Sequence, residues 1–454
     1  MRDGPSLDRV WTIRTDGSRR KLHPADVRGR FIVARRWVFL FLMLIALALP
    51  IVPVGSHPAM QLDIAARRFY LFGGVFNATD AWIGLFVLGA VAFMLLFVTA
   101  WKGRVWCGWA CPQTVFLEGA YRRIERLIDG SGEKRLRDDL APMTNGKAAR
   151  RVLKHTLFVL FSFVIAHSAV AYFISFPVLF ADMKEGPGAH ADAFIWAMVV
   201  TAFLYFNYAW FREQMCIVIC PYGRLQSVLV DGGSTVVGYD KERGEPRGKA
   251  GTTKGDCVDC TRCVAVCPTG IDIRNGLQME CIACAQCIDA CDEIMDKLKR
   301  PRGLVRYGSQ HSFVGGDKRP SRARLWVYGL LAVAAMGGGA FATARRTNVE
   351  ARLLRTRGAP WVVMDGRVRN QYELHLTNKQ PVATTFQITP SLPASAEVIL
   401  PMTSVTLQPL GSTRLPIFVS IPIDGSRNFE LQVAVDAPGL HTVAVARFLT
   451  PSMR

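Results

Sequence analysis

Residues 345–454 contain no cysteine, and all twelve cysteines of this 454-residue chain lie between Cys107 and Cys291. Disulfides persist in oxidising compartments, so an extracellular disulfide scaffold would carry cysteines in the part of the chain that faces outside. As argued below, residues 345–454 are that part. The sequence therefore excludes a disulfide framework and predicts that these thiols serve metal or redox chemistry.

Acidic residues are also scarce, because 36 Asp and Glu face 55 Lys and Arg, giving a net charge of +19. The basic residues number ten in 1–36, eleven in 101–151 and eighteen in 212–324, but only two in 55–79 and one in 177–193. This alternation follows the positive-inside rule. It predicts that the three basic segments are cytoplasmic, and it favours a membrane over nucleic acid as the partner.

Five apolar runs approach or exceed the roughly 20 residues that span a bilayer as a helix; they cover 37–54, 81–101, 156–176, 193–211 and 325–344. The first run follows a long polar, basic stretch and lacks a small-residue cleavage site, so we expect a retained anchor. Basic residues flank the fifth run on both sides, so its direction follows from parity alone. The sequence predicts a multi-pass membrane protein, with residues 345–454 on the side opposite the cytoplasm. The family resemblance given below implies that this membrane is the bacterial inner membrane and that this side is the periplasm.

Eight cysteines form one spacing pattern that occurs twice in succession. Each copy reads C-x2-C-x2-C-x3-C, and only the first is followed by proline, at Pro268. This is the bacterial ferredoxin run, in which the fourth cysteine of each copy ligates the other cluster. The pattern predicts two 4Fe-4S clusters, with cluster 1 on Cys257, Cys260, Cys263 and Cys291 and cluster 2 on Cys281, Cys284, Cys287 and Cys267.

A pair of zinc sites is the competing interpretation, since zinc is also held by four cysteines. Zinc does not require two copies of the C-x2-C-x2-C-x3-C pattern with a proline after the first copy, so we favour iron–sulfur clusters. Asp292 stands where the first copy has Pro268. Its negative charge should lower the reduction potential of the nearby cluster.

The other four cysteines form two C-x3-C-P motifs, Cys107 with Cys111 and Cys216 with Cys220, each preceded by a tryptophan six residues before its first cysteine. The matching offsets suggest an internal repeat of a two-helix unit. Residues i and i+4 share a helix face, so each pair could present two thiols together. Three interpretations remain open: a soft-metal site for Cu(I), zinc or a further cluster, a redox-active dithiol, or small apolar side chains that pack helices.

The remaining segments give weaker signals. His155, just before the third run, and His167, within it, could ligate a haem, but packing side chains are the simpler interpretation. Residues 113–130 have the pattern of a basic amphipathic helix on the cytoplasmic membrane surface. Residues 238–254 and 299–324 are interpreted as basic linkers on either side of the cluster motifs.

Short alternating segments appear after about residue 360, near 372–376, 384–389, 396–400, 413–421, 428–436 and 441–449. Short strands at such spacing predict an immunoglobulin-like β-sandwich. The predicted fold is a bundle of five transmembrane helices with an inserted α+β two-cluster ferredoxin domain and a C-terminal all-β sandwich. Its parts are a basic N-terminus (1–36), a four-helix region (37–236), the ferredoxin domain with linkers (237–324), the fifth helix (325–344) and the β-domain (345–454).

Together these motifs resemble the cytochrome c oxidase accessory protein family, called CcoG, FixG or RdxA. The resemblance covers nearly the whole chain and includes both cluster motifs, with an acidic Asp292 after the second. The other matching segments are Gly29-Arg30-Phe31, Arg35-Arg36-Trp37, 66–73, 106–114, 216–224, 238–240, 243–247 and 302–307.

The resemblance implies a role in assembling cbb3-type haem–copper oxidase by reducing Cu(II) to Cu(I). On that view the clusters pass electrons, Cys107, Cys111, Cys216 and Cys220 bind or reduce copper, and the partners are membrane lipid with oxidase subunits or copper-delivery proteins. Two alternatives remain open. One is a general conduit between quinol or a cytoplasmic donor and a protein acceptor, and the other is a non-catalytic assembly scaffold.

Overall fold

The computed structural model describes residue 12, 20–55, 57–77, 80–249, 251, 254–313, 322–423 and 428–451. The predicted basic segments 1–36 and 299–324 lie partly outside these residues. The chain divides into two compact units, which are described separately. One comprises Met1–Gly74 with Trp82–Gly339, and the other Val75–Ala81 with Ala340–Arg454.

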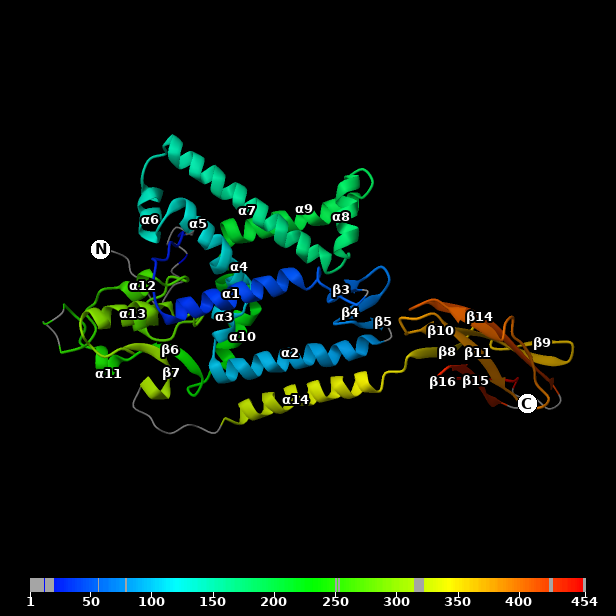
Figure 1. The fold of residues 1–454 in the computed structure, drawn as a ribbon. Helices are drawn as coiled ribbons and strands as arrows, with labels where there is room; N and C mark the ends of the chain where they lie inside the picture. Colours follow the sequence, from blue (N-terminus) through cyan, green and yellow to red (C-terminus); the bar gives the residue numbers. More distant parts are fainter. Residues whose placement is uncertain are drawn as a thin grey trace. The chain divides into compact units, whose positions relative to one another are not determined.

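Within the described residues, five helices are long and apolar enough to cross a membrane, as predicted (Figure 1). They are α1 (Arg30–Ala48), α2 (Ala81–Lys102), α7 (Asn145–Ala171), α9 (Ala191–Tyr205) continued by the π-helical turn η3 (Phe206–Phe211), and α14 (Ala323–Ala344). The first begins and ends earlier than the predicted 37–54. Its basic first turns contact other parts of the protein, and Pro50 and Pro53 lie beyond its end, where proline disfavours a helix.

Helices α2 and α14 run side by side (Figure 1). A Cβ atom added at Gly338 would lie 2.7 Å from the Phe86 ring, and one at Gly329 would lie 3.2 Å from the Phe97 ring. Small residues let membrane helices approach closely. The glycines of α14 therefore make room for the aromatic side chains of α2.

The segment after the first C-x3-C-P motif differs from its prediction. It is helical through α4 (Pro112–Phe116), η2 (Leu117–Tyr121) and α5 (Arg122–Asp129). It does not rest on the bundle through one apolar face, because Arg122 and Glu125 are buried as well as Tyr121. Ion pairs with distant residues, described below, replace water around these charges.

Short helices complete the membrane region: α3 (Val105–Trp109), α6 (Gly132–Leu140), α8 (Phe176–Glu185), η4 (Met215–Ile219) and α10 (Pro221–Leu229). The loop between α1 and α2 contains the short strands β1 (Pro53–Val54), β2 (His57–Pro58), β3 (Met60–Asp63), β4 (Arg68–Leu71) and β5 (Gly74–Asn77). Strands β1 and β2 pair antiparallel, as do β3 and β4.

The cluster motifs lie between two paired strands rather than between two free linkers. Strand β6 (Thr235–Tyr239) pairs antiparallel with β7 (Val305–Ser309). Between them lie α11 (Lys241–Gly244), α12 (Arg262–Ala265), η5 (Ile273–Asn275) and α13 (Gln286–Lys297), and η6 (His311–Phe313) follows. The segments predicted as linkers thus contribute strands that close this region.

The second unit contains two facing antiparallel sheets, as the immunoglobulin-like prediction requires. One has the order β12-β14-β10-β8 with β9 paired to β10, and the other has the order β13-β11-β15-β16. Side chains such as Tyr372, Phe386 and Phe448 form a fully buried core. The strands are β8 (Val349–Arg355), β9 (Val362–Met364), β10 (Arg367–Asn378), β11 (Thr384–Ser391), β12 (Glu397–Ile399), β13 (Ser404–Leu407), β14 (Ser412–Pro422), β15 (Phe429–Ala437) and β16 (Leu440–Phe448).

A buried ion cluster also lies in this unit. Lys379 Nζ lies 2.8 Å from Asp80 and 2.9 Å from Glu350, and Arg346 lies 2.9 Å from Asp80. Asp80 is separated from the sandwich by more than 250 positions in the sequence. These pairs explain why Val75–Ala81 belongs to the same compact unit as the β-strands.

Candidate functional site

The two C-x2-C-x2-C segments, at 257–263 and 281–287, fold into loops with the same backbone shape. The second residue after the first cysteine has a positive φ in both loops, at Asp259 and Ala283, and so does the fourth, at Thr261 and Ala285. Non-glycine residues seldom adopt this conformation, and such strain concentrates at functional sites. The spacing repeat seen in the sequence is therefore a repeat in three dimensions.

Each loop borders a small cavity, and the thiols on its wall come from both copies of the C-x2-C-x2-C-x3-C pattern. One cavity is lined by Cys257, Cys260, Cys263 and Cys291. The other is lined by Cys267, Cys281, Cys284 and Cys287, and also by Cys263. The structure thus brings together both predicted sets of four, including the crossed fourth cysteine of each.

The surroundings of these thiols suit an iron–sulfur cluster. The backbone N–H of Ala283 donates to the sulfur of Cys281, and that of Gln286 donates to Cys284. Hydrogen bonds of this kind tune cluster potentials. Burial raises the pKa of Cys263 to about 12, so cluster binding would displace a proton there. The apolar remainder of the walls, such as Ile271 and Leu304, limits access of water.

The two cavities differ in how open their cysteines are. Cys260 is exposed, whereas Cys281 and Cys284 are buried. The hydroxyl of Tyr239 also hydrogen-bonds to Cys257. The first cavity is therefore the one with an exposed cysteine on its wall.

The two C-x3-C-P motifs share one local geometry. Cys111 is the N-cap of α4 and Cys220 is the N-cap of α10, with φ and ψ of −61° and 127° against −60° and 112°. A proline occupies the first turn of each helix, where its missing N–H costs no hydrogen bond. The backbone N–H groups of Gln113 and Thr114 donate to the sulfur of Cys111. Burial outweighs these donors, which favour the thiolate, and raises the pKa of Cys111 above its ordinary value.

The four cysteines of these motifs lie near one another. Cys216 is close enough to Cys107, Cys111 and Cys220 for their charges to interact. Burial, followed by the neighbouring Cys111, raises the pKa of Cys107 to about 12, and its thiol donates to Gln226 Oε1 at 3.5 Å. Across the residues described, no three His, Cys, Asp or Glu side chains are placed to hold a single ion. The same holds for the eight cluster cysteines, so this result does not separate the two sets of thiols.

The first C-x3-C-P motif packs directly on the loop of the second cluster motif. A Cβ atom added at Gly108 would lie 2.4 Å from the carbonyl oxygen of Ile282 and 3.0 Å from the Cα of Cys284. Only glycine fits this approach. The motif Cys107–Cys111 and the cysteine loop Cys281–Cys287 are thus in van der Waals contact through their backbones.

Polar side chains reinforce the same contact. Arg104 donates to the carbonyl of Cys281 at 3.2 Å and to the carbonyl of Gly223, two residues after the second C-x3-C-P motif. Tyr307 donates to the carbonyl of Ala283 at 2.6 Å and accepts from Trp109 Nε1 at 3.2 Å. Both C-x3-C-P motifs are therefore connected to one cysteine loop.

The start of α1 is part of this assembly. Arg35 is fully buried and donates from Nε to the carbonyl of Gly108 at 2.9 Å. With the side-chain amide of Gln286 oriented to satisfy its neighbours, Arg35 also donates to Gln286 at 2.8 Å. The first membrane helix thus contacts both the paired-cysteine motif and the cluster motif.

A buried ion network lies behind the motifs and was not predicted. Arg212 makes two hydrogen bonds to Glu125, at 2.6 and 3.1 Å, and Arg135 makes a third at 2.7 Å. Burial alone would raise the pKa of Glu125, but these arginines outweigh it and the pKa is lowered. The adjacent Arg122 pairs with Glu213 at 3.3 Å. A positive φ of 54° at Arg212 marks the bend between the fourth membrane helix and the second C-x3-C-P motif.

The two membrane histidines have separate partners. Nδ1 of His155 lies 3.0 Å from the Tyr205 hydroxyl, and Nδ1 of His167 lies 2.9 Å from the Phe163 carbonyl. Neither contact links one histidine to the other. This arrangement fits the packing interpretation rather than a shared haem.

Three family descriptions match the chain: a 4Fe-4S binding domain at residues 81–129, a 4Fe-4S dicluster domain at 211–310, and the immunoglobulin-like fold at the C-terminus of FixG, a putative oxidoreductase, at 339–451. The first match includes Cys107 and Cys111. A further cluster therefore stays among the interpretations of the C-x3-C-P motifs.

Full-length relatives agree with these matches. The nitrogen fixation protein FixG of Rhizobium meliloti is 34% identical, over 89% of this chain and 87% of its own length. The proteins RdxA and RdxB of Cereibacter sphaeroides are 35% and 33% identical, over 85% and 86% of this chain and 87% and 86% of their own lengths. The chain therefore belongs to the FixG/RdxA family and is a membrane iron–sulfur electron-transfer protein.

Proposed function

We propose that this protein passes single electrons from its clusters to the C-x3-C-P cysteines, where Cu(II) is reduced to Cu(I) for the assembly of a cbb3-type oxidase. The contact between Gly108 and the loop of Cys284 carries this proposal. This contact joins the first C-x3-C-P motif to the loop of the second cluster motif through packed backbone, without an intervening layer of side chains. Thiolates also favour Cu(I), the product of the reaction.

The difference in exposure gives the transfer a direction. The exposed Cys260 marks the entry point at cluster 1, and the buried cluster 2 loop contacts the C-x3-C-P motifs. The eight cysteines of the two C-x2-C-x2-C-x3-C copies would hold the clusters, and each cluster would supply the single electron that Cu(II) needs to become Cu(I). The chain's own residues hold the cluster cysteines and the C-x3-C-P cysteines at a fixed separation.

The C-x3-C-P site gathers four thiols, because Cys216 lies near Cys107, Cys111 and Cys220. On this proposal Cu(I) leaves the site for a delivery protein or an oxidase subunit. The positive-inside pattern supports a cytoplasmic location for the N-terminus and cluster motifs, with the β-domain in the periplasm.

A purified, anaerobically reduced protein mixed with Cu(II) and a Cu(I)-specific chelator tests this function. Cluster bleaching and chelate colour are followed together in the wild type and in Cys107→Ser with Cys216→Ser. Both signals should appear in the wild type and fade in the variant. Iron content and bleaching by ferricyanide serve as the control, since the variant must still hold and discharge its clusters. Wild-type clusters that stay reduced in the presence of copper would contradict the proposal.

One observation favours the general electron conduit as a second candidate. A cavity of about 220 Å³ borders Cys281 and has mainly apolar walls, which include Val236, Val237 and Met279, with Arg104 and Gln310 as polar groups. Such a cavity has the character of a small-molecule site and could receive the head group of a quinol. If a quinol reduces the clusters and copper leaves them reduced, this second function replaces the first.

A further inference from the structure

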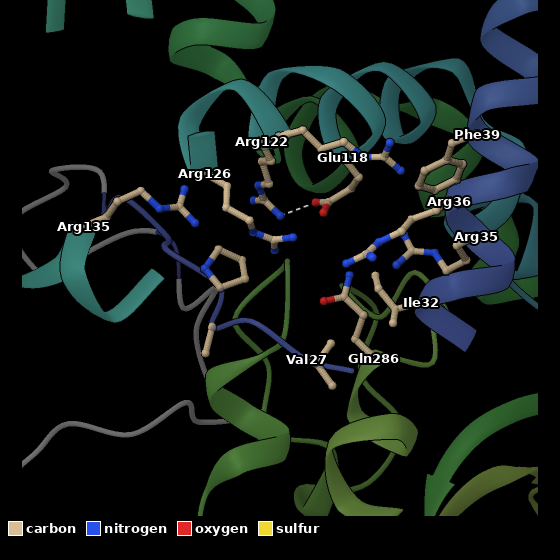
Figure 2. Close-up of a pocket in the computed structure, with 13 residues that line it drawn as sticks. Val27, Ile32, Arg35, Arg36, Phe39, Glu118, Arg122, Arg126, Arg135 and Gln286 are labelled. Atoms are coloured by element: carbon tan, nitrogen blue, oxygen red, sulfur yellow. Dashed lines mark hydrogen bonds and ion pairs between the residues drawn. The ribbon is translucent and has the colours of Figure 1, made fainter. Parts of the chain in front are cut away.

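A pocket rich in arginine lies between α1, the η2–α5 helix and the chain before α1 (Figure 2). Figure 2 shows Arg35 and Arg36 entering it from α1, and Arg122 and Arg126 from the opposite helix, above Gln286. Its volume is about 40 Å³, which is room for a few water molecules or one small anionic group. Six arginines line it, Arg35, Arg36, Arg122, Arg123, Arg126 and Arg135, against one acidic residue, Glu118.

Acidic partners on the protein balance only some of this charge. Arg122 pairs with Glu118 and Glu213, Arg126 with Asp26, and Arg135 with Glu125. Among the residues that the structure describes, the other three lining arginines, at positions 35, 36 and 123, form no ion pair. The pocket therefore holds an excess of positive charge.

Several buried donors in the pocket also lack an acceptor. One terminal nitrogen of Arg35, which is fully buried, has no hydrogen-bond partner in the described part of the chain. The same holds for Nε of Arg122 and Nε of Arg135, whose residues are 6% and 5% exposed. A buried donor without a partner is destabilising, because it has lost its hydrogen bonds to water. A bound anion would accept from such groups and remove this cost.

The like charges also act on one another. Partial burial lowers the pKa of Arg123, and the neighbouring Arg36 and Arg126 lower it further. Repulsion of this kind is relieved by a counter-charge. Arginine is the side chain best suited to phosphate, because its planar donors bind two oxygens at once.

The position of the pocket indicates where its anion comes from. Arg36 precedes Trp37, which is 69% exposed, and the exposed apolar face of α1 continues through Leu40, Phe41 and Leu44. Tryptophan is enriched at the membrane–water interface. Across the pocket, Leu127 on α5 is 86% exposed. The arginines thus lie at the level of lipid head groups, beside an apolar surface fit for acyl chains.

We infer that this pocket binds the phosphate of an anionic phospholipid, whose acyl chains lie along the exposed face of α1. Basic pockets at the ends of membrane helices bind such head groups. Arg35 donates to Gly108 in the first C-x3-C-P motif and to Gln286 in the second cluster motif. A lipid phosphate bound to Arg35 therefore helps to hold the first membrane helix against both motifs. The inference is independent of copper, since it concerns lipid binding alone.

The test uses the full-length, delipidated protein in a non-ionic detergent. Phosphatidylglycerol and phosphatidylcholine are titrated separately, and binding is measured by native mass spectrometry and by the shift in thermal unfolding. The variant Arg36→Ala with Arg123→Ala removes two lining charges that make no hydrogen bond to the described residues. Arg137→Ala with Arg151→Ala is the matched control, because it removes two exposed arginines that do not line the pocket.

The expected result is tighter binding of phosphatidylglycerol than of phosphatidylcholine by the wild type. The pocket variant should lose roughly thirtyfold in affinity, at about fivefold for each basic residue near a membrane surface, and the control should stay close to the wild type. Arg36→Gln, with an expected loss of about fivefold, serves if the double variant does not fold. Equal losses in both double variants, or equal affinity for the two lipids, would overturn the inference.

Two further arms separate a lipid from other anions. Inorganic phosphate is added in competition with phosphatidylglycerol, and an acidic peptide is tested in the same way. Weak competition by both supports the lipid. Tight binding of free phosphate or of the peptide, with no retention of phosphatidylglycerol, would show that a soluble anion occupies the pocket instead.

Discussion

The carboxylate of Asp289 accepts a hydrogen bond from the backbone N–H of Ile32, 2.8 Å away. Its other oxygen accepts from the N–H of Phe31 at 3.2 Å, so one side chain of α13 caps the first membrane helix. A Cβ atom at Gly29 would lie 2.2 Å from this carboxylate, which leaves room only for glycine. The ferredoxin helix and the membrane bundle are therefore joined at a helix N-terminus, where negative charge is favoured.

Asp289→Asn should destabilise the protein by about 1–2 kcal/mol, because it removes a charge and one acceptor from this cap. Thermal unfolding in detergent, followed by loss of cluster absorbance, measures the effect. Asp296→Asn is the matched control on the same helix, since Asp296 is exposed and pairs only with Arg302 among the described residues. A larger loss in the control than in Asp289→Asn would contradict the capping role.

Gly108→Ala should disturb the contact between the paired cysteines and the cluster 2 loop. The added methyl must displace backbone at Ile282, at a cost of about 1–3 kcal/mol. We expect an altered electron paramagnetic resonance signal from one cluster and slower copper reduction at equal iron content. Gly146→Ala is the control, because nothing lies within 4 Å of its added Cβ. Unchanged spectra and rates for Gly108→Ala would count against the contact as the electron route.

Asp292→Asn should raise the reduction potential of the cluster that includes Cys291. Asp292 is 8% exposed, and its carboxylate accepts from the backbone N–H of Gly303 at 3.0 Å. Asparagine keeps that acceptor and removes the negative charge, so the added electron meets less repulsion. We expect a rise of about 40 mV, equivalent to about 1 kcal/mol for one electron. A redox titration measures it, and a potential that falls would contradict the electrostatic argument.

Glu125→Gln should destabilise the protein by about 3–5 kcal/mol, because it removes the buried carboxylate that Arg212 and Arg135 share. The lowered pKa of Glu125 also gives a pH dependence. Its stabilising effect is complete above the unfolded value of about 4.3 and decreases as the pH falls below it. Unfolding measured between pH 2 and 6 should therefore show a smaller acid loss in the variant. Glu133→Gln is the control, since Glu133 is exposed.

The sequence predicted the elements whose signal is local. Cysteine spacing identified the two sets of four thiols, apolar length identified five helices, and alternation identified six of the strands in the sandwich. The strands β8, β9 and β13 were missed. β9 and β13 are very short, and β8 begins close to the end of a membrane helix, before the point where alternation was recognised.

Contacts between distant parts of the chain could not be predicted in this way. Arg122 and Glu125 look like the polar face of a surface helix, but their partners Arg212 and Glu213 lie about 90 positions later. The cap from Asp289 to Ile32 joins residues 257 positions apart. Propensity and periodicity describe neighbours along the chain, and they carry no information on such pairs.

The pairing of β6 with β7 has a consequence for how this architecture could have arisen. Thr235 and Ser309 are partners in the two-stranded sheet, so the cluster-bearing segment leaves and rejoins the chain at one place. A segment with adjacent ends can be gained, lost or exchanged while the rest of the chain keeps its path. The membrane helices and the metal-bearing segment could therefore have separate ancestries and still make one polypeptide.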